Sequence, residues 1–255
     1  MSKVTSCNLR LVSVFMLILF FYSAPVYGQE DALPQDVKAW QQAAAKAVQQ
    51  EDYGTAVEIY GQIIQAYPQT RYAIEAYRET AAAYIQAQQY EVAKARIETL
   101  KNEYADHPDF AESLHCIAIR YGWNDRWDEA IQLHRYNVAV NPSYEKAMWS
   151  QVEIIYDHIR RNDWAGAQAA QAEMLTRFSE QPTLSKEIWQ ISRAYANAGR
   201  PDTALEMCSY LANQFPETEY GAIAQSEIIG VLSASVRDRN FRGWYFVGRQ
   251  CDYLM

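Results

Sequence analysis

The chain has 255 residues and a net charge of −8 at neutral pH, from 23 Lys and Arg against 31 Asp and Glu. An acidic chain without a basic stripe argues against nucleic acid or anionic lipid as a partner. The sequence also lacks the G-x-G-x-x-G, G-x-x-x-x-G-K-[ST], G-x-S-x-G and H-E-x-x-H motifs. It therefore predicts no enzyme, no cofactor and no metal site.

Residues 1–28 have the pattern of a secretory signal peptide. Lys3 and Arg10 precede a largely apolar run over 11–22, and Val26-Tyr27-Gly28 suits cleavage by signal peptidase. We expect an exported protein, periplasmic or extracellular, that meets the membrane only in transit and begins near Gln29, with residues 29–36 as a linker. The alternative is an uncleaved anchor, because the apolar run is near the short end of a membrane span.

A 37-residue period follows this segment. The same small residue recurs at Ala56, Ala93, Ala130, Ala167 and Ala204. Twelve residues earlier in each period lie Ala44, Ala81, Ala118, Ile155 and Ser192. Small residues suit close helix crossings, and the polar turns between the two positions offer Asp and Asn as helix caps and Gly199 as a helix end. The repeating unit is predicted to be helix, turn, helix.

These residues resemble the tetratricopeptide repeat (TPR) family. The first unit carries the family's aromatic, small and closing positions as Trp40, Ala44, Tyr53, Ala56, Tyr60 and Pro68. The resemblance implies an all-α, right-handed superhelical solenoid with about five repeats over 37–221 and a degenerate sixth repeat or cap over 222–255. It also implies a scaffold that binds partner proteins or peptides in a concave groove. The unit departs from the usual 34 residues by three.

Two features of the junctions between repeats lead to further predictions. Pro108 and Pro182 come three residues later in the period than the other closing prolines, which predicts that the second helix is one turn longer in repeats 2 and 4. The segments 67–73 and 215–221 share an aromatic-Pro-x-Thr-x-Tyr-small pattern. That pattern resembles the TPR subtype of bacterial cell-envelope proteins, such as those of outer-membrane β-barrel assembly and the Tol-Pal system.

Isolated residues that could carry chemistry are better explained by packing. Ser143 begins an S-x-x-K pattern but follows Pro142, where a helix cap is expected. His158 and Cys208 stand at repeat positions that hold Tyr elsewhere, so both are expected in the core. With Cys116 and Cys251, the mature chain has three cysteines, enough for one disulfide at most.

The family's groove positions, carried over by repeat phase, differ between the two halves of the chain. In repeats 1 and 2 they are mostly polar: Lys38, Gln41, Gln42, Gln49, Glu75, Arg78 and Gln86. In repeats 3 to 5 the predicted groove is His115, Trp123, Trp149, Glu153, Tyr156, Arg160, Trp189, Arg193 and Asn197, with Cys116 and Lys186 beside them. Aromatic residues and Arg dominate binding hot spots, so the second half is the expected partner site. Trp149 and Trp189 could instead pack between helices.

The set of Lys and Asn that grips chaperone tails in some family members is absent, since Gln41, Arg78, His115, Val152 and Trp189 occupy the position of its first Lys. A rival function is an accessory subunit that regulates or presents substrate to an envelope or secreted carbohydrate or cell-wall enzyme, with aromatic residues stacking on sugars.

The C-terminal end is rich in aromatic residues where a solenoid should become polar. Phe241, Trp244, Tyr245 and Phe246 follow a predicted helix over 222–236. Because apolar side chains on this scale are seldom left in water, residues 241–255 are expected to fold back as a sixth second helix or to mediate self-association.

Overall fold

The computed structural model describes residues 34–141 and 147–237, which form eleven α-helices and no strand. The first helix of each repeat, here the A helix, is α1 (Gln35–Gln49), α3 (Arg71–Gln86), α5 (Phe110–Trp123), α7 (Ala147–Arg160), α9 (Leu184–Asn197) and α11 (Glu219–Arg237). The second, the B helix, is α2 (Tyr53–Ala66), α4 (Tyr90–Glu103), α6 (Trp127–Val140), α8 (Trp164–Arg177) and α10 (Pro201–Gln214). The predicted all-α repeat solenoid is confirmed.

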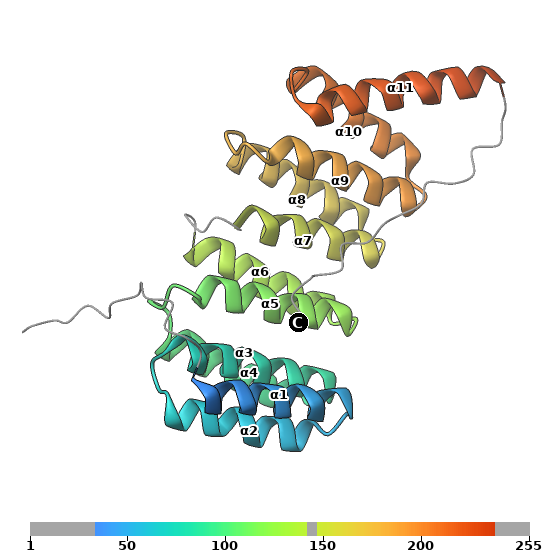
Figure 1. The fold of residues 1–255 in the computed structure, drawn as a ribbon. Helices are drawn as coiled ribbons and strands as arrows, with labels where there is room; N and C mark the ends of the chain where they lie inside the picture. The colour runs from blue at the N-terminus through green and yellow to red at the C-terminus, as the bar shows by residue number, and fades with distance from the viewer. Residues whose placement is uncertain (1–33, 142–146, 238–255) are drawn as a thin grey trace, which may run out of the picture. The chain divides into compact units, whose positions relative to one another are not determined.

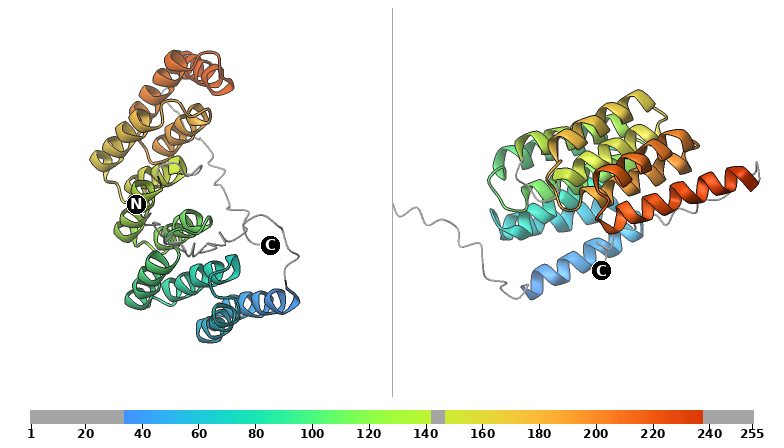
Figure 2. Two further views of the ribbon diagram at one scale, coloured as in Figure 1. Left: turned by 90° about the vertical axis from the view of Figure 1, so that its left-hand side faces the viewer. Right: turned by 90° about the horizontal axis from the view of Figure 1, so that it is seen from above.

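Each A helix from α1 to α9 packs against the B helix that follows it, and each B helix except α4 and α8 also packs closely against the next A helix. Successive A helices touch from α3 onward, so they form one continuous layer. Figure 1 shows the helices following one another in a single stack, and the left view of Figure 2 shows the two helices of each pair side by side. All of them belong to one compact unit that begins at Gln35.

The 37-residue phase of small residues marks the core of this stack. The alanines from Ala56 to Ala167 are fully buried at helix crossings, and Ala204 is 7% exposed. Large apolar residues fill the space between the alanines, among them Tyr121 and Tyr195 at one shared repeat position. The backbones can approach closely where the side chain is small, which is why this position is the most regular in the sequence.

The expectation of longer B helices in repeats 2 and 4 was wrong, because α4 and α8 have 14 residues like the other B helices. The later prolines lie in longer loops instead, since 104–109 and 178–183 have six residues whereas 67–70 and 215–218 have four. In these four loops the next A helix begins two or three residues after the proline, as α3 does after Pro68 and α5 after Pro108. The position of each of these prolines therefore indicates where the following helix begins rather than where the preceding helix ends.

The turn inside every complete repeat is the same Schellman motif with a left-handed residue. Its residues recur every 37 positions: Glu51, Gln88, Asp125, Asn162 and Gly199, with φ between 58° and 77°. In each turn the next amide bonds back to the carbonyl five residues earlier, as in Gln89 N to Tyr84 O at 2.8 Å. Only the last of the five turns has the glycine that this conformation favours.

Replacing Gln88 with Gly should raise the free energy of unfolding by about 0.5 to 1 kcal/mol, because the left-handed conformation strains a residue with a Cβ. Gly199→Gln should lower it by a similar amount. Urea unfolding of the full chain measures both. The control is Gln62→Gly, inside α2 with helical backbone, which should cost about 1 kcal/mol. A loss from Gln88→Gly would show that this turn is not strained.

Caps from the predicted polar turns form in some repeats only. The carboxylates of Asp52 and Asp163 accept backbone N–H bonds from Thr55 and Gly166 at 3.1 and 3.0 Å. The turn before α6 has Arg126 at the cap position, and its side chain makes no capping hydrogen bond to the helix backbone. The predicted signal peptide, the cap at Ser143, Cys251 and the segment 241–255 lie outside the described residues. Within the described ranges, no helix is long and apolar enough to span a membrane.

Candidate functional site

The predicted groove residues lie on three successive A helices. His115 and Trp123 belong to α5, four belong to α7, and the last three belong to α9. All except His115 are at least partly exposed. We call the exposed set the A-helix face: Trp123, Trp149, Glu153, Tyr156, Arg160, Trp189, Arg193 and Asn197.

His115 is a structural residue and is left out of the face. It is 7% exposed, and its Nδ1 lies 3.0 Å from the hydroxyl of Ser150 on α7. Its ring centroid is 5.3 Å from that of His134 on α6, which is fully buried. The amide of Asn137 also donates to the Ser150 hydroxyl, at 3.3 Å. These polar side chains join α5, α6 and α7 beneath the surface.

Trp123 is the most exposed aromatic residue of the face. It ends α5 and is 53% exposed. The Arg120 guanidinium lies 4.9 Å from its ring centroid, within the range of a cation–π contact. Trp123 shares its repeat phase with Arg160 and Asn197, which are also exposed, so the three form a row across neighbouring helices. An indole held by stacking but open to solvent is suited to contact a partner.

Arg160 ends α7 between two carboxylates. Its Nη1 lies 2.7 Å from Oδ1 of Asp157 and 3.6 Å from Oε2 of Glu153, and its guanidinium is 5.8 Å from the ring centroid of Tyr156. The Arg160 side chain remains 43% exposed. It is therefore oriented by its neighbours and still accessible to a partner.

The α9 part of the face is tied to α11. Trp189 packs against Tyr220 with ring centroids 5.5 Å apart, and the Arg193 guanidinium lies 5.3 Å from the Trp189 ring. Arg193 also pairs with Glu227 at 3.6 Å. Like Trp149, Trp189 is partly buried against the core, so the packing role considered for both is present beside any binding role.

Asp157 is a residue of the site that the sequence did not indicate. It is 1% exposed, and burial raises the pKa of Asp157 to about 6, although the nearby Arg160 opposes the shift. The equivalent positions in other repeats hold Lys46, Ala83, Arg120 and Ala194, so no repeated pattern pointed to it. The residue that makes room for its carboxylate is Gly122 on α5, where a Cβ would lie 3.0 Å from Oδ1 of Asp157.

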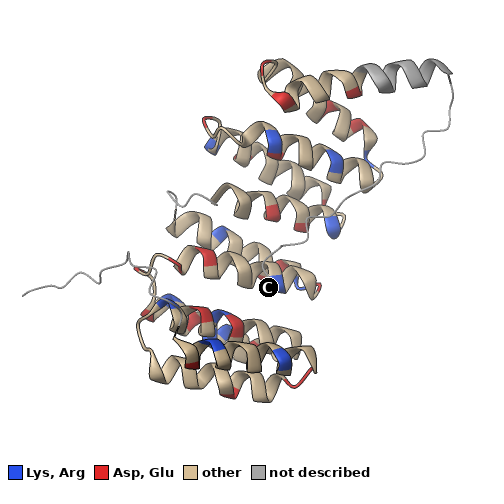
Figure 3. Cartoon of the chain, in the orientation of Figure 1, with Lys and Arg blue, Asp and Glu red and all other residues tan. Residues whose placement is uncertain are grey.

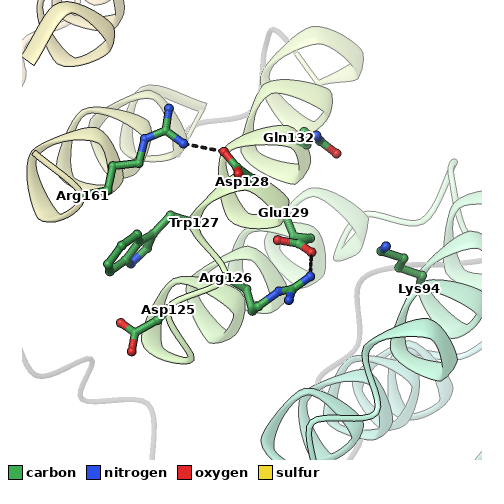
Figure 4. A pocket seen from close by; sticks show the side chains of 8 residues that line it. All are labelled: Lys94, Asp125, Arg126, Trp127, Asp128, Glu129, Gln132 and Arg161. Atoms are coloured by element: carbon green, nitrogen blue, oxygen red, sulfur yellow. Dashed lines mark hydrogen bonds and ion pairs between the residues drawn. The ribbon is translucent and has the colours of Figure 1, made fainter. Parts of the chain in front are cut away.

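A separate polar pocket of about 400 Å³ lies around the first turn of α6. Figure 4 shows its lining, which is Lys94, Asp125, Arg126, Trp127, Asp128, Glu129, Gln132 and Arg161. Arg126 pairs with Glu129, and Arg161 pairs with Asp128 on the neighbouring helix. Both guanidinium groups are thus engaged in ion pairs, and the Arg161–Asp128 pair stabilises the junction between repeats 3 and 4. This pocket is not the candidate site.

Charge is interspersed along the described helices (Figure 3). The described residues hold no close group of three His, Cys, Asp or Glu side chains that could bind a metal ion. His158 and Cys208 are buried as expected, at 4% and 5% exposure. His158 Nδ1 lies 2.9 Å from the Asp163 carboxylate that caps α8, so this histidine supports a helix start.

Part of the chain matches a known repeat family. Residues 47–114 match the family model of the tetratricopeptide repeat. Among solved structures, the chain is similar to TPR-like repeats of a putative kinesin light chain from Podosopora anserina, with 20% identity, a TM-score of 0.46, and 73% of this chain and 99% of that chain covered.

Two other structures are similar over most of the chain. The MamA protein shares 14% identity with a TM-score of 0.42, covering 71% of this chain and 93% of that one. A tetratricopeptide repeat protein from Parabacteroides merdae shares 11% identity with a TM-score of 0.35, covering 80% and 90%. No curated protein matches the chain. The family match supports tetratricopeptide repeats from the end of α1 into α5, and the 37-residue phase continues the same unit to α10.

Proposed function

We propose that this chain is an exported, non-enzymatic scaffold whose A-helix face binds a peptide segment of a partner protein. The observation that carries the proposal is Trp123, an exposed indole stacked under Arg120 in a row with Arg160. Trp, Tyr and Arg are the residues that contribute most to binding energy, and three A helices present them side by side. TPR-like repeats commonly bind proteins, which agrees with this assignment.

Replacing Trp123 with Ala should weaken partner recovery about tenfold or more, because a hot-spot side chain contributes about 2 kcal/mol or more to binding. The measurement is native co-purification from the host, quantified against the wild-type chain. Tyr210→Ala on α10 is the matched control, since Tyr210 is an aromatic residue 37% exposed on a B helix. Both variants should keep the wild-type unfolding midpoint. Equal loss from both would place the site elsewhere.

Trp123 is also compatible with the rival function, which is that of an accessory subunit of a carbohydrate or cell-wall enzyme. An exposed indole can stack on a sugar ring as well as on a peptide. Binding of isolated cell-wall glycans by the chain, lost in Trp123→Ala and kept in Tyr210→Ala, would favour this rival.

We further propose export to the periplasm or the cell exterior in a bacterial cell envelope, from the charged and apolar start and from the junction pattern shared by 67–73 and 215–221. Mass spectrometry of the protein from its host should find a chain that begins near Gln29. Recovery of intact residues 1–28 in the membrane fraction would instead support the anchor.

A further inference from the structure

Asp157 connects the interior of the repeat stack to the A-helix face. Its buried carboxylate lies against α5, where a Cβ built on Gly122 would be 3.0 Å from Oδ1. The same oxygen is 2.7 Å from Nη1 of Arg160, whose side chain is 43% exposed. The buried acid is thus the carboxylate closest to an exposed cation, at 2.7 Å against 3.6 Å for Glu153.

The carboxylate of Asp157 is poorly compensated. Taking a carboxylate out of water costs several kcal/mol, and one partly exposed guanidinium returns only part of that. Burial therefore raises the pKa of Asp157 to about 6 even with Arg160 beside it. Between pH 7 and 5 Asp157 takes up a proton, whereas ordinary exposed carboxylates, with pKa near 4, stay ionised.

Other titratable groups lie on α7 and on the helices packed against it. On α7 itself, Glu153 lies 3.6 Å from Nη1 of Arg160, farther than Asp157 at 2.7 Å. Arg161, the residue after α7, pairs with Asp163, the residue before α8, and with Asp128 on α6. On α6, His134 lies near enough to Arg160 for that charge to help lower the pKa of His134.

On the two A helices that flank α7, the nearest cations are paired or stacked. On α9, Arg193 pairs with Glu227, and on α5, Arg120 stacks on Trp123. The described contact of Asp157 with α5 is Gly122, which carries no charge. Arg160 is therefore the group whose environment changes most when Asp157 is protonated.

We propose that the Asp157–Arg160 pair is an acid-operated switch of the A-helix face, an inference that rests on the binding function proposed above. At neutral pH the buried carboxylate holds Arg160 against α7. On acidification Asp157 becomes neutral, the pair opens, and the guanidinium turns to the carboxylate groups of a bound segment. The face gains one positive charge in a pH range where Asp and Glu side chains of a partner are still anionic.

The first test needs no partner. Side-chain NMR of the full chain should show the Asp157 carboxyl titrating near pH 6, with the Arg160 guanidinium more restricted in rotation at pH 7.5 than at pH 5. In Asp157→Asn the rotation of the guanidinium should be the same at both pH values. Glu153→Gln, which removes the other acid near Arg160, should keep the pH step. Identical Arg160 behaviour in the wild type and Asp157→Asn would overturn the switch.

The second test probes recognition with labelled decapeptides of Glu or Gln. The wild-type chain should bind the Glu peptide about tenfold more tightly at pH 5.5 than at pH 7.5, as expected for one new charge-assisted hydrogen bond, and should show no such change with the Gln peptide. Asp157→Asn should bind the Glu peptide equally at both pH values, and Arg160→Gln weakly at both.

No pH-dependent preference for the Glu peptide would overturn the recognition step. Failure of the proposed function appears separately, as partner recovery that is insensitive to Trp123→Ala.

Discussion

Gly221→Ala should destabilise the packing of α11 against α10 by about 1 to 3 kcal/mol, as expected for a side chain forced into occupied space. A Cβ at residue 221 would lie 2.0 Å from the carbonyl oxygen of Phe215, a backbone atom that cannot move aside alone. The equivalent junction has Ala73 at this position, fully buried. The two junctions differ in the turn before the helix. Gln69 in the first junction has φ of 59°, whereas Glu217 at the equivalent position is not left-handed.

Hydrogen exchange of the α11 amides should show this effect, because the end of a repeat stack can open without global unfolding. Adding Glu217→Gly should restore part of the loss by allowing the left-handed turn of the first junction. Gly61→Ala is the control, as nothing lies near its Cβ inside α2 and the change should stabilise by about 1 kcal/mol. Unchanged protection of α11 in Gly221→Ala would contradict the close contact.

His134→Ile should stabilise the protein increasingly as the pH falls, by about 2 kcal/mol more at pH 5 than at pH 8. Complete burial lowers the pKa of His134 well below its usual value, with the charge of Arg160 and the imidazole of His115 adding to the shift. The unfolded chain takes up a proton at this residue below about pH 6.5, and the folded chain does not. Stability from neutral His134 is therefore present above pH 6.5 and lost as the pH falls.

Isoleucine is a fitting replacement because Ile97 fills the same repeat position on α4 and is buried. Urea unfolding of both proteins at pH 8, 6.5 and 5 measures the difference, in which the titration of all other groups cancels. Asp157 acts in the opposite direction, since its raised pKa makes its contribution largest at low pH and reduces it as the pH rises through 6. Parallel stability profiles for wild type and His134→Ile would show that His134 titrates normally.

The sequence predicted the repeating unit better than the turns and junctions that connect its helices. The alanine phase located the helix crossings because only small residues fit there, and that constraint is local and repeated. The left-handed turn residues escaped notice because Glu51 and Gln88 occupy a conformation for which their side chains carry no signal. The prolines misled on helix length, since proline restricts the residues around it without specifying whether a helix or the loop becomes longer.

For the site, phase alone placed eight of nine candidates on an exposed surface but could not distinguish His115, which the buried Ser150 turns inward. Asp157 could not be predicted from the sequence, because its importance depends on the absence of a side chain at Gly122 on another helix. Contacts of that kind occur once and leave no period in the sequence.

Site-specific photo-crosslinking in the native host tests the partner surface most directly. A benzophenone amino acid would replace Trp123 on the A-helix face in one protein and Tyr210 on a B helix in another, both exposed positions. We expect position 123 to crosslink a single partner segment in high yield and position 210 to give none of that product. The same crosslinked partner from both positions, or from position 210 alone, would contradict the A-helix face as the binding surface.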